Sequence, residues 1–410
     1  MYNRSMPPHQ PLQVLILTAD AGFGHRSAAK AVAEALAELY GSTVSVRMEN
    51  VLDDRRTPFF LRDSQSDYDK IVRSLPELYR LGYEASNEAI PTTLAEVALA
   101  LLLLPAVREL LDDARPDVVL TTYPLYQSAL VAAFLTGARA VPVLTVVTDL
   151  VSVHRLWFNP HVDACLVPTE QVQALALESG LDAARVQLTG IPVYPAITRE
   201  RRAQAEIRAE LGWRTDLTTL LAVGSRRVEH LVEALTVVNH FGAPLQLVVV
   251  AGKDEELYHQ LQAVDWHIPT HLYEYVSTMP AFLHAADLLI CKAGGLIVTE
   301  ALACGLPLLL VDAIPGQETG NADYVVQGGA GELAPGPLAL LEALAHLLAQ
   351  DGNLLRQRAA AAARLGQPQA AYSVARKVFE AGQAGSPVAP LPRHTQRLRE
   401  FANQIRNISR

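Results

Sequence analysis

The hydrophobic positions of the chain alternate between two spacings, and this alternation predicts a parallel α/β architecture. Short apolar runs of strand length, such as 13–18 and 245–250, are each followed by a stretch with apolar residues at helical spacing. In the first such stretch, 26–40, the apolar positions are Ala28, Val32, Leu36 and Leu39. Repeated strand–helix alternation is typical of a parallel sheet with helices on its faces.

The alternation occurs in two series, which predict two domains. The first series predicts strands at 13–18, 44–48, 117–121, 141–147, 166–167 and 186–188, with helices that include 26–40 and 93–113. The second predicts strands at 217–223, 245–250, 270–274, 288–291 and 308–311, with helices at 227–240, 254–263, 296–304 and within 336–382. A charged helical stretch, 198–208, separates the series. We therefore predict an N-terminal domain at 1–197, a C-terminal domain at 198–385 and a Pro-rich, basic tail at 386–410.

Composition is consistent with two large cores and excludes several classes of protein. The chain has 410 residues, of which 50% are hydrophobic and 19% charged. Its net charge of −9 argues against nucleic acid as a partner. The three cysteines lie in apolar runs without metal-type spacing, which indicates reduced thiols in a cytoplasmic protein. They are Cys165, Cys291 and Cys304.

Neither a signal peptide nor a membrane-spanning helix is expected. The first residues lack the apolar core of a signal peptide. The most apolar stretch, 94–104, contains Glu96 and ends at Pro105. It is much shorter than the roughly 20 residues that a spanning helix needs, so we predict a buried helix here.

A strand-to-helix turn at Gly294 and Gly295 is the first candidate binding element. The free N–H groups and the dipole at a helix start favour an anion, and two glycines let a phosphate approach the backbone. Glu300 lies in the second turn of this helix, where a carboxylate can accept hydrogen bonds from two ribose hydroxyls. The turn therefore suits the diphosphate and ribose of a nucleotide.

A polar loop follows the next strand of the same series. It runs Pro315-Gly316-Gln317-Glu318, with Asn321 three residues later. Open α/β sheets bind ligands at the carboxyl edge of their strands, where this loop must lie. Its side chains can hydrogen bond the hydroxyls of a sugar.

The first strand-to-helix turn contains Gly22, Gly24 and His25. Ser27 stands where a dinucleotide fingerprint would have its third glycine, which disfavours NAD. Because the ordinary pKa of histidine is close to neutral, His25 is suited to take a proton from an attacking hydroxyl. A structural role, with His25 capping the helix, is the alternative interpretation.

Asp149 and Trp157 belong to a loop that follows the strand at 141–147. Asp149 can orient His25 or act as a base itself, and Trp157 offers a flat apolar face for a glycerol or acyl chain. The structural alternatives are a helix cap for Asp149 and a core position for Trp157. A further turn, from Tyr123-Pro124 to Gln127, follows the strand at 117–121.

Five segments together resemble one glycosyltransferase family. They are GFGHRSAA (22–29), VTDLVSVHRLWFNP (147–160), KAGG (292–295), EALACGLP (300–307) and IPGQETGN (314–321). They resemble the monogalactosyldiacylglycerol synthases and bacterial diacylglycerol glucosyltransferases, which are related to the lipid II N-acetylglucosaminyltransferase. The resemblance implies a GT-B fold, in which two Rossmann-like doubly wound domains face each other across a cleft. The N-terminal domain would bind the acceptor and the C-terminal domain the nucleotide sugar.

The resemblance also assigns residues to roles. His25 and Asp149 would be catalytic. The expected donor-binding residues are Gly224, Ser225, Arg226, Lys292, Gly294, Gly295, Glu300, Gln317, Glu318 and Asn321. The expected acceptor-binding residues are Gly24, Tyr123, Pro124, Gln127 and Trp157. Two places depart from the family pattern: Tyr123 replaces a histidine, and Gly224-Ser225-Arg226-Arg227 replaces a glycine-rich loop. We expect backbone N–H groups of Gly224 and Ser225, with an arginine fork, to bind the diphosphate there.

The implied reaction is transfer of glucose or galactose from a UDP-sugar to a lipid hydroxyl, with inversion, and the expected acceptor is diacylglycerol. A UDP-hexose would be the co-substrate, and no cofactor or metal is expected, since Asp67-Tyr68-Asp69 matches a metal-binding DxD motif only in a polar stretch. The enzyme would act peripherally at the inner face of the cell membrane, docking through 55–80 or the basic end, 393–410. Two alternatives stay open: a sugar-nucleotide 2-epimerase of the same fold, and a non-catalytic nucleotide-sugar-binding protein.

Overall fold

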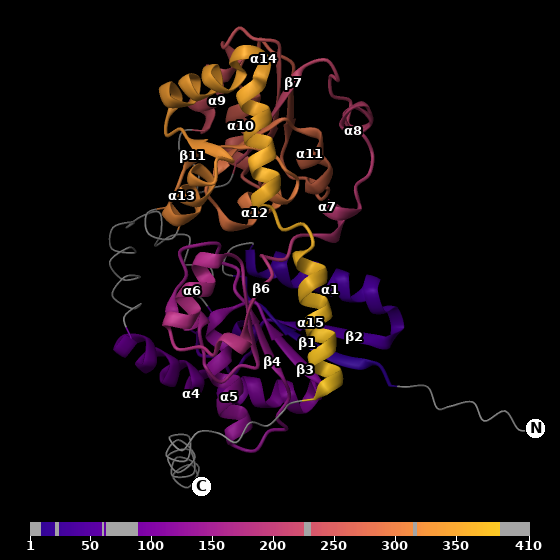
Figure 1. The fold of residues 1–410 in the computed structure, drawn as a ribbon, viewed down its shortest axis with the longest axis vertical. Coiled ribbons are helices and arrows are strands. Elements are labelled where there is room, and N and C mark those ends of the chain that lie inside the picture. Colours follow the sequence, from indigo (N-terminus) through magenta and orange to yellow (C-terminus); the bar gives the residue numbers. More distant parts are fainter. Residues whose placement is uncertain are drawn as a thin grey trace, which may run out of the picture.

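The computed structural model describes residues 10–20, 24–59, 61–62, 89–224, 231–314 and 318–385. Two six-stranded parallel sheets lie one above the other along the long axis of the molecule (Figure 1). The N-terminal sheet has the strand order β2-β1-β3-β4-β5-β6. Its strands are β1 (Leu12–Leu17), β2 (Val44–Glu49), β3 (Val118–Thr121), β4 (Val143–Val146), β5 (Ala164–Val167) and β6 (Val186–Leu188).

The C-terminal sheet repeats this plan with the strand order β12-β11-β10-β7-β8-β9. Its strands are β7 (Thr218–Val223), β8 (Leu245–Val250), β9 (Thr270–Tyr273), β10 (Leu288–Lys292), β11 (Leu308–Asp312) and β12 (Gly331–Leu333). In each sheet the chain first adds strands on one side of its starting strand and then continues on the other side, β1 being the starting strand in one sheet and β7 in the other. This is the topology of a doubly wound sheet, so the predicted fold class is confirmed. Ligands bind such sheets at the carboxyl edge beside the point of reversal.

Helices cover the faces of both sheets. In the N-terminal half they are α1 (Gly24–Tyr40), α4 (Ala89–Ala114), α5 (Gln127–Leu135) and α6 (Glu170–Glu178), and α7 (Pro195–Arg199) leads out of it. The later helices are α8 (Gln204–Glu210), α9 (Leu231–Asn239), α10 (Glu255–Gln262), α11 (Met279–Ala285), α12 (Gly295–Ala303), α13 (Thr319–Gln327), α14 (Pro337–Leu365) and α15 (Ala370–Ala384).

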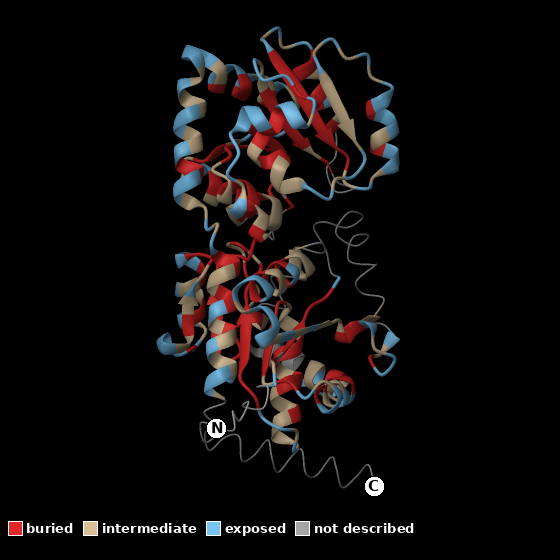
Figure 2. Ribbon diagram, turned by 90° about the vertical axis from the view of Figure 1, so that its right-hand side faces the viewer, coloured by how far each residue is buried: buried red, intermediate tan, exposed pale blue. Residues whose placement is uncertain are grey.

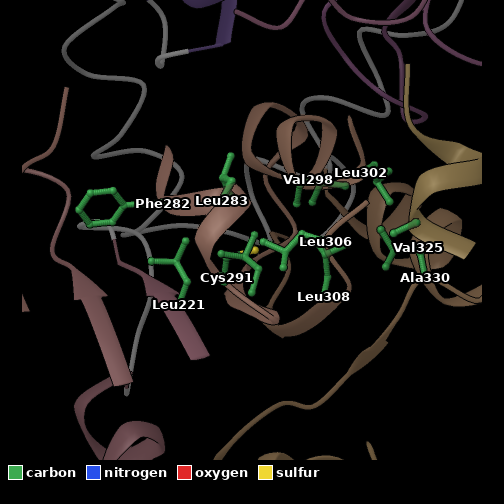
Figure 3. Packing of buried hydrophobic residues seen from close by; sticks show 14 of the residues in the cluster. Leu221, Phe282, Leu283, Cys291, Val298, Leu302, Leu306, Leu308, Val325 and Ala330 are labelled. Carbon is green, nitrogen blue, oxygen red and sulfur yellow. The ribbon is translucent and has the colours of Figure 1, made fainter. Parts of the chain in front are cut away.

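Burial explains why the strands read as continuous apolar runs. Every residue of β3, β4 and β5 is buried, because helices cover both faces of the sheet (Figure 2). Helix α12 ends where the sequence predicted: Gly305 has a φ of 67°, a left-handed conformation that glycine adopts without strain. Around α12, buried residues such as Cys291, Val298 and Leu302 form the core of the C-terminal half (Figure 3).

One part of the predicted second domain, residues 370–384, packs with the N-terminal half. Helix α15 returns to that half and packs against α1 (Figure 1). The rings of Tyr40 and Phe379 stack with their centroids 3.8 Å apart. Val374 and Val378 are buried in the same core as β1 and β3. Residues 370–384 therefore pack as part of the N-terminal domain, because their apolar face covers its sheet.

The expectation of a buried helix at 94–104 is only partly correct. Helix α4 contains this stretch, with Pro105 inside it, and Leu103 is fully buried. Val97 and Leu101, however, are 42% and 47% exposed. No helix within the described ranges is both long enough and apolar enough to cross a membrane. The three cysteines are free thiols, as predicted.

Candidate active site

His25 lies in the first turn of α1, at the carboxyl edge of the N-terminal sheet. Its Nδ1 is 2.7 Å from Oγ1 of Thr148, and its backbone carbonyl accepts a hydrogen bond from Thr122 Oγ1 at 3.0 Å. The ring packs edge-on against Tyr123, with 4.9 Å between centroids. Burial lowers the pKa of His25 to about 4, opposed by the backbone hydrogen bond with Thr122. The imidazole is therefore neutral at pH 7, the form that can accept a proton.

Asp149 follows β4 and lies next to this corner. Its Oδ2 accepts a hydrogen bond from Nε1 of Trp157 at 2.7 Å. Burial raises the pKa of Asp149 to about 6, although the Trp157 hydrogen bond works in the opposite direction. Within the described part of the chain, the hydrogen-bond partner of the His25 ring is Thr148 rather than Asp149. Any orienting effect of Asp149 on His25 would therefore not run through a direct hydrogen bond between the two side chains, and the role of base stays a prediction for both residues.

Trp157 is not a platform for an acyl chain, contrary to the expectation from its sequence. It lies in a short 3₁₀ helix, η4 (Arg155–Trp157), and only 1% of its surface is exposed. The ring packs in a buried cluster with Val147 and Val167. A large apolar ring gains more from this core than from solvent contact, and its N–H finds a partner in Asp149. Trp157 therefore positions the Asp149 carboxylate.

Gln127 was also predicted to contact the acceptor, and this too is wrong. Its side chain is buried, donates to the carbonyl of Trp157 at 3.2 Å and accepts from the backbone N–H of Asn159 at 3.3 Å. Gln127 thus braces the loop that holds Trp157. Tyr123 and Pro124 are partly exposed near His25, and with Gly24 they stay predicted acceptor contacts.

The Gly294–Gly295 turn has the geometry expected of an anion site. Helix α12 begins at Gly295, and its first intrahelical bond runs from Val298 N–H to the Gly294 carbonyl. The N–H groups of residues 295–297 therefore have no helical partner. The Lys292 ammonium nitrogen lies 3.5 Å from the position that a Cβ on Gly294 would take. Free N–H groups, a helix dipole and a cation converge at one point.

Two buried side chains hold the rest of this turn. Glu318 forms an ion pair with Lys292 and accepts a hydrogen bond from Ile314 N–H at 3.1 Å. Asn321 donates from Nδ2 to the Ala293 carbonyl at 2.9 Å, while its buried Oδ1 has no partner among the described residues. An orphaned buried acceptor is costly, so Oδ1 is suited to a hydroxyl of a ligand.

Glu300 is the most perturbed carboxyl of the site. It is 6% exposed, and no described residue donates a hydrogen bond to its carboxylate. Burial raises the pKa of Glu300 to about 8. A buried carboxyl without a protein partner is a feature of binding sites more often than of cores.

Gly224, the described residue that directly follows β7, is placed differently from the prediction. The N–H of Gly224 donates to the Val250 carbonyl at 2.8 Å, which extends the pairing of β7 with β8 by one residue. A Cβ at this position would lie 2.5 Å from Leu257. Gly224 is therefore a packing glycine and its N–H is not available for a phosphate. Ser225, Arg226, Arg227, Gln317 and the Asp67–Asp69 motif lie outside the described residues, as do the 393–410 segment and most of 55–80.

The structure adds residues that sequence reasoning missed. Lys253 has a φ of 66° after Gly252, and this left-handed pair places its ammonium 4.5 Å from the ring centroid of Tyr275. Tyr275 is 58% exposed and follows β9, at the carboxyl edge of the donor-side sheet. The sequence signal for this edge was the Gly252-Lys253 pair directly after a strand.

Thr148 is the second missed residue, and it joins the two halves of the site. Its hydroxyl is the partner of His25, while its carbonyl oxygen is 3.7 Å from the position that a Cβ on Gly295 would take. Leu150 N and Asn321 Nδ2 are 4.0 and 3.8 Å from the same position. The candidate base and the candidate phosphate turn therefore meet across the domain interface.

Among the described residues, no group of three or more His, Cys, Asp or Glu side chains is placed to hold a metal ion. The GT-B architecture is shared with Acinetobacter baumannii MurG, with a TM-score of 0.58 at 17% identity over 90% of this chain and 99% of that one. This likeness agrees with the two-domain arrangement predicted from the sequence.

Comparison with protein families identifies both halves of the chain. Residues 25–193 match the model of monogalactosyldiacylglycerol (MGDG) synthase, and residues 218–373 match the C-terminal domain of glycosyltransferase family 28. A probable monogalactosyldiacylglycerol synthase 2 of Oryza sativa subsp. japonica is 30% identical over 92% of this chain and 82% of its own length. Monogalactosyldiacylglycerol synthase 2 of Arabidopsis thaliana is 29% identical over 92% of this chain and 82% of its own length. With its match running through both domains, the chain belongs to the monogalactosyldiacylglycerol synthase family of glycosyltransferases.

Proposed function

We propose that this protein transfers a hexose from a UDP-sugar to the free hydroxyl of diacylglycerol, with inversion at the anomeric carbon. Family membership supports the lipid acceptor and the hexose donor. The single observation that carries the proposal is the position of Thr148: its hydroxyl contacts His25, and its carbonyl oxygen lies 3.7 Å from the place that a Cβ on Gly295 would take. An acceptor hydroxyl activated at His25 and Asp149 is thereby brought next to a diphosphate at α12.

The proposed chemistry is a single displacement. A base at the His25–Asp149 corner takes the proton of the acceptor hydroxyl as its oxygen bonds to the anomeric carbon from one face. The bond from that carbon to the diphosphate oxygen breaks on the opposite face, and UDP leaves with the electron pair. The N–H groups of residues 295–297 and the Lys292 ammonium stabilise the charge that develops on UDP.

We assign the remaining parts of the UDP-sugar, its ribose and its hexose, to different residues of the C-terminal half. Glu300, to which no described residue donates a hydrogen bond, takes the two ribose hydroxyls. The orphaned Oδ1 of Asn321 accepts from a hydroxyl of the hexose. Glu318 is engaged by Lys292 and Ile314, so we assign it to holding Lys292 at the turn rather than to direct sugar binding.

The deciding assay uses radiolabelled UDP-glucose and UDP-galactose with and without vesicles that contain diacylglycerol. We expect labelled glycosyl-diacylglycerol from at least one donor, formed at least about 100-fold more slowly by the His25→Ala variant. A 2-epimerase would instead convert the sugar nucleotide in the absence of lipid. A non-catalytic binding protein would retain UDP-sugar without forming any product. Either result would reject the proposed transfer.

Activity is expected to survive EDTA. The start of α12 and Lys292 already supply positive charge where the leaving diphosphate must lie, so the reaction needs no divalent cation for that purpose. Turnover is measured after dialysis against EDTA and again after addition of Mn²⁺ or Mg²⁺. If activity falls in EDTA and Mn²⁺ restores it, the reaction needs a metal, and Asp67 and Asp69 become the candidate ligands.

A lipid acceptor requires contact with a bilayer, and we propose that the protein docks peripherally at the cytoplasmic face of the membrane. Two apolar side chains one helical turn apart on α4, Val97 and Leu101, are exposed and support such an approach. The net charge is −9, so electrostatic attraction has to come from local basic segments, of which 55–80 and 393–410 are the candidates.

Co-sedimentation with vesicles tests this docking. Binding to anionic vesicles is expected to weaken as salt rises, because screening limits the field of surface charges to about 8 Å at physiological ionic strength. The part of vesicle binding that persists at high salt must be apolar. A variant with both Val97→Ser and Leu101→Ser is expected to lose this salt-resistant binding. Equal binding to neutral and anionic vesicles would reject the electrostatic part of the proposal.

A further inference from the structure

A loop of the acceptor half, residues 148–152, lies directly on the donor half. Thr148 and Leu150 approach Gly295 at the start of α12, and Val151 and Ser152 approach Gly320 at the start of α13. Leu150 is buried in the same core cluster as Val298 of α12. On the acceptor side, Thr169 Oγ1 donates to the Leu150 carbonyl at 3.2 Å. The loop is thus held from both sides of the interface.

Gly320 is the closest point of this contact. A Cβ added there would lie 3.2 Å from both Cβ and Cγ1 of Val151, closer than nine in ten real Cβ contacts, and 2.5 Å from Ser152 Oγ, which would have to rotate away. The φ of Gly320 is not in the left-handed region, so the backbone does not require glycine. Within a helix, alanine is in fact the preferred residue. The absence of a side chain at this position therefore serves the contact with the loop.

The same loop contains Thr148 and Asp149, which lie beside His25 in the candidate catalytic site. Thr148 Oγ1 lies 2.7 Å from His25 Nδ1, and Asp149 follows it in the chain with its carboxylate on Trp157. A displacement of Ser152 away from α13 would move Thr148 and Asp149 with it, because only three residues connect them. The approach of α13 to the loop and the placement of both catalytic groups are therefore mechanically linked.

We propose that Gly320 is a positioning residue, which seats the 148–152 loop on the donor half and so places Thr148 and Asp149 for catalysis. This inference rests on the proposed function, since it assigns the reaction to the His25–Asp149 corner. Gly320 acts through the loop and needs no contact with either substrate. It couples closure of the two halves to assembly of the base.

The primary test is Gly320→Ala. We expect kcat to fall by about 10- to 100-fold, because a displacement on the order of 1 Å at a reacting group has an effect of this size. The dissociation constant of UDP, measured by calorimetry, is expected to change by less than about twofold. Asp323→Ala is the matched control, since it changes an exposed position of the same helix and is expected to leave both quantities unchanged.

Rescue from the loop side separates positioning from a folding defect. Ser152→Ala removes the oxygen that lies closest to the new methyl group, so the double variant Gly320→Ala/Ser152→Ala is expected to regain most of the lost kcat. The reciprocal variant Ser152→Val crowds the contact from the other side and is expected to lower kcat in the same way, which keeps the test available if Gly320→Ala does not fold. Unchanged kcat in Gly320→Ala, or no recovery in the double variant, would overturn the inference.

A readout independent of turnover distinguishes this inference from the proposed function. Hydrogen–deuterium exchange at the backbone amides of 148–152 is expected to be faster in Gly320→Ala than in the natural protein, with recovery in the double variant. If the natural protein transfers no hexose, the proposed function fails while the exchange result still tests the contact. If it does transfer hexose and the exchange of the loop is unchanged in Gly320→Ala, the contact claim fails alone.

Discussion

Replacing His25 with alanine is expected to lower kcat by about 10²- to 10⁴-fold while UDP binding stays unchanged. This range is the usual worth of a positioned general base. UDP binding is expected to persist because the proposed diphosphate site is at the start of α12, in the other half of the molecule. The measurement combines steady-state turnover with calorimetric titration of UDP, so that a loss of chemistry is separated from a loss of donor affinity.

The pH dependence of kcat at saturating donor distinguishes His25 from Asp149 as the base. Each group acts in its unprotonated form, so activity rises as pH passes through the pKa of the base. Burial brings the pKa of Asp149 up to about 6 and that of His25 down to about 4. A rise centred near pH 6 would assign the proton transfer to Asp149, and a rise near pH 4 would assign it to His25.

Two variants sharpen this assignment. Trp157→Phe keeps a buried ring but removes the N–H that stabilises the Asp149 carboxylate, so the pKa of Asp149 should rise further. If Asp149 is the base, the acid limb of the profile moves to higher pH, whereas a His25 profile does not respond. Asp149→Asn combined with His25→Ala should lose little more than the worse single variant if the two act as a unit. Near-normal turnover in both single variants would end the claim that this corner performs the chemistry.

Donor affinity is expected to rise with pH, by on the order of 10- to 100-fold between pH 6 and 8.5. The pKa of Glu300 is raised to about 8 by burial, so the carboxyl is mostly protonated at pH 6. Two ribose hydroxyls need the ionised carboxylate as an acceptor, and binding therefore favours the form that becomes more populated as pH rises. Below its pKa the ionised fraction changes about tenfold per pH unit. UDP-glucose is the ligand of choice, because its diphosphate does not titrate in this range.

Two variants make the Glu300 prediction specific. Glu300→Gln removes the titrating group, so UDP-glucose affinity should become independent of pH and fall at pH 8.5 by about 1–3 kcal/mol, the loss expected when hydrogen bonds to a charged group go. Asn321→Ala is the matched control: it weakens binding at every pH but keeps the slope. If the natural protein binds UDP-glucose equally at pH 6 and pH 8.5, Glu300 does not hold the ribose.

The strands and the glycine turns could be predicted from sequence because local chemistry determines them. The turn at Gly294 and Gly295, the helix stop at Gly305 and the apolar runs of β8 and β11 each depend on a few neighbouring residues. The family motifs likewise brought His25, Asp149 and the α12 start together in one proposal. The structure confirms that these elements lie at facing edges of two sheets.

The incorrect predictions concern residues whose surroundings are determined by tertiary packing rather than by neighbouring residues in the sequence. Trp157 and Gln127 are predicted to contact the acceptor, with a core position as the alternative for Trp157. Both side chains are buried in the structure, in a core that the sequence does not display. Gly224 was assigned to a phosphate because it follows a strand, but one more residue of sheet pairing takes up its N–H. The role of Gly320 depends on Ser152, far away in the chain, and no local pattern relates the two.

The return of α15 to the acceptor half means that the polypeptide crosses between the halves twice. The crossings are neighbours: a Cβ on Gly190, before α7, would lie 2.6 Å from Cβ of Gln367, just ahead of α15. Because both connections lie side by side, a relative movement of the two halves has to be accommodated by these two segments together. They also dictate how the enzyme can be dissected. An isolated acceptor half cut after β6 would expose the apolar side chains of Leu12 and Val118, whereas the same half with 370–384 joined to its end retains the cover that makes it a folding unit.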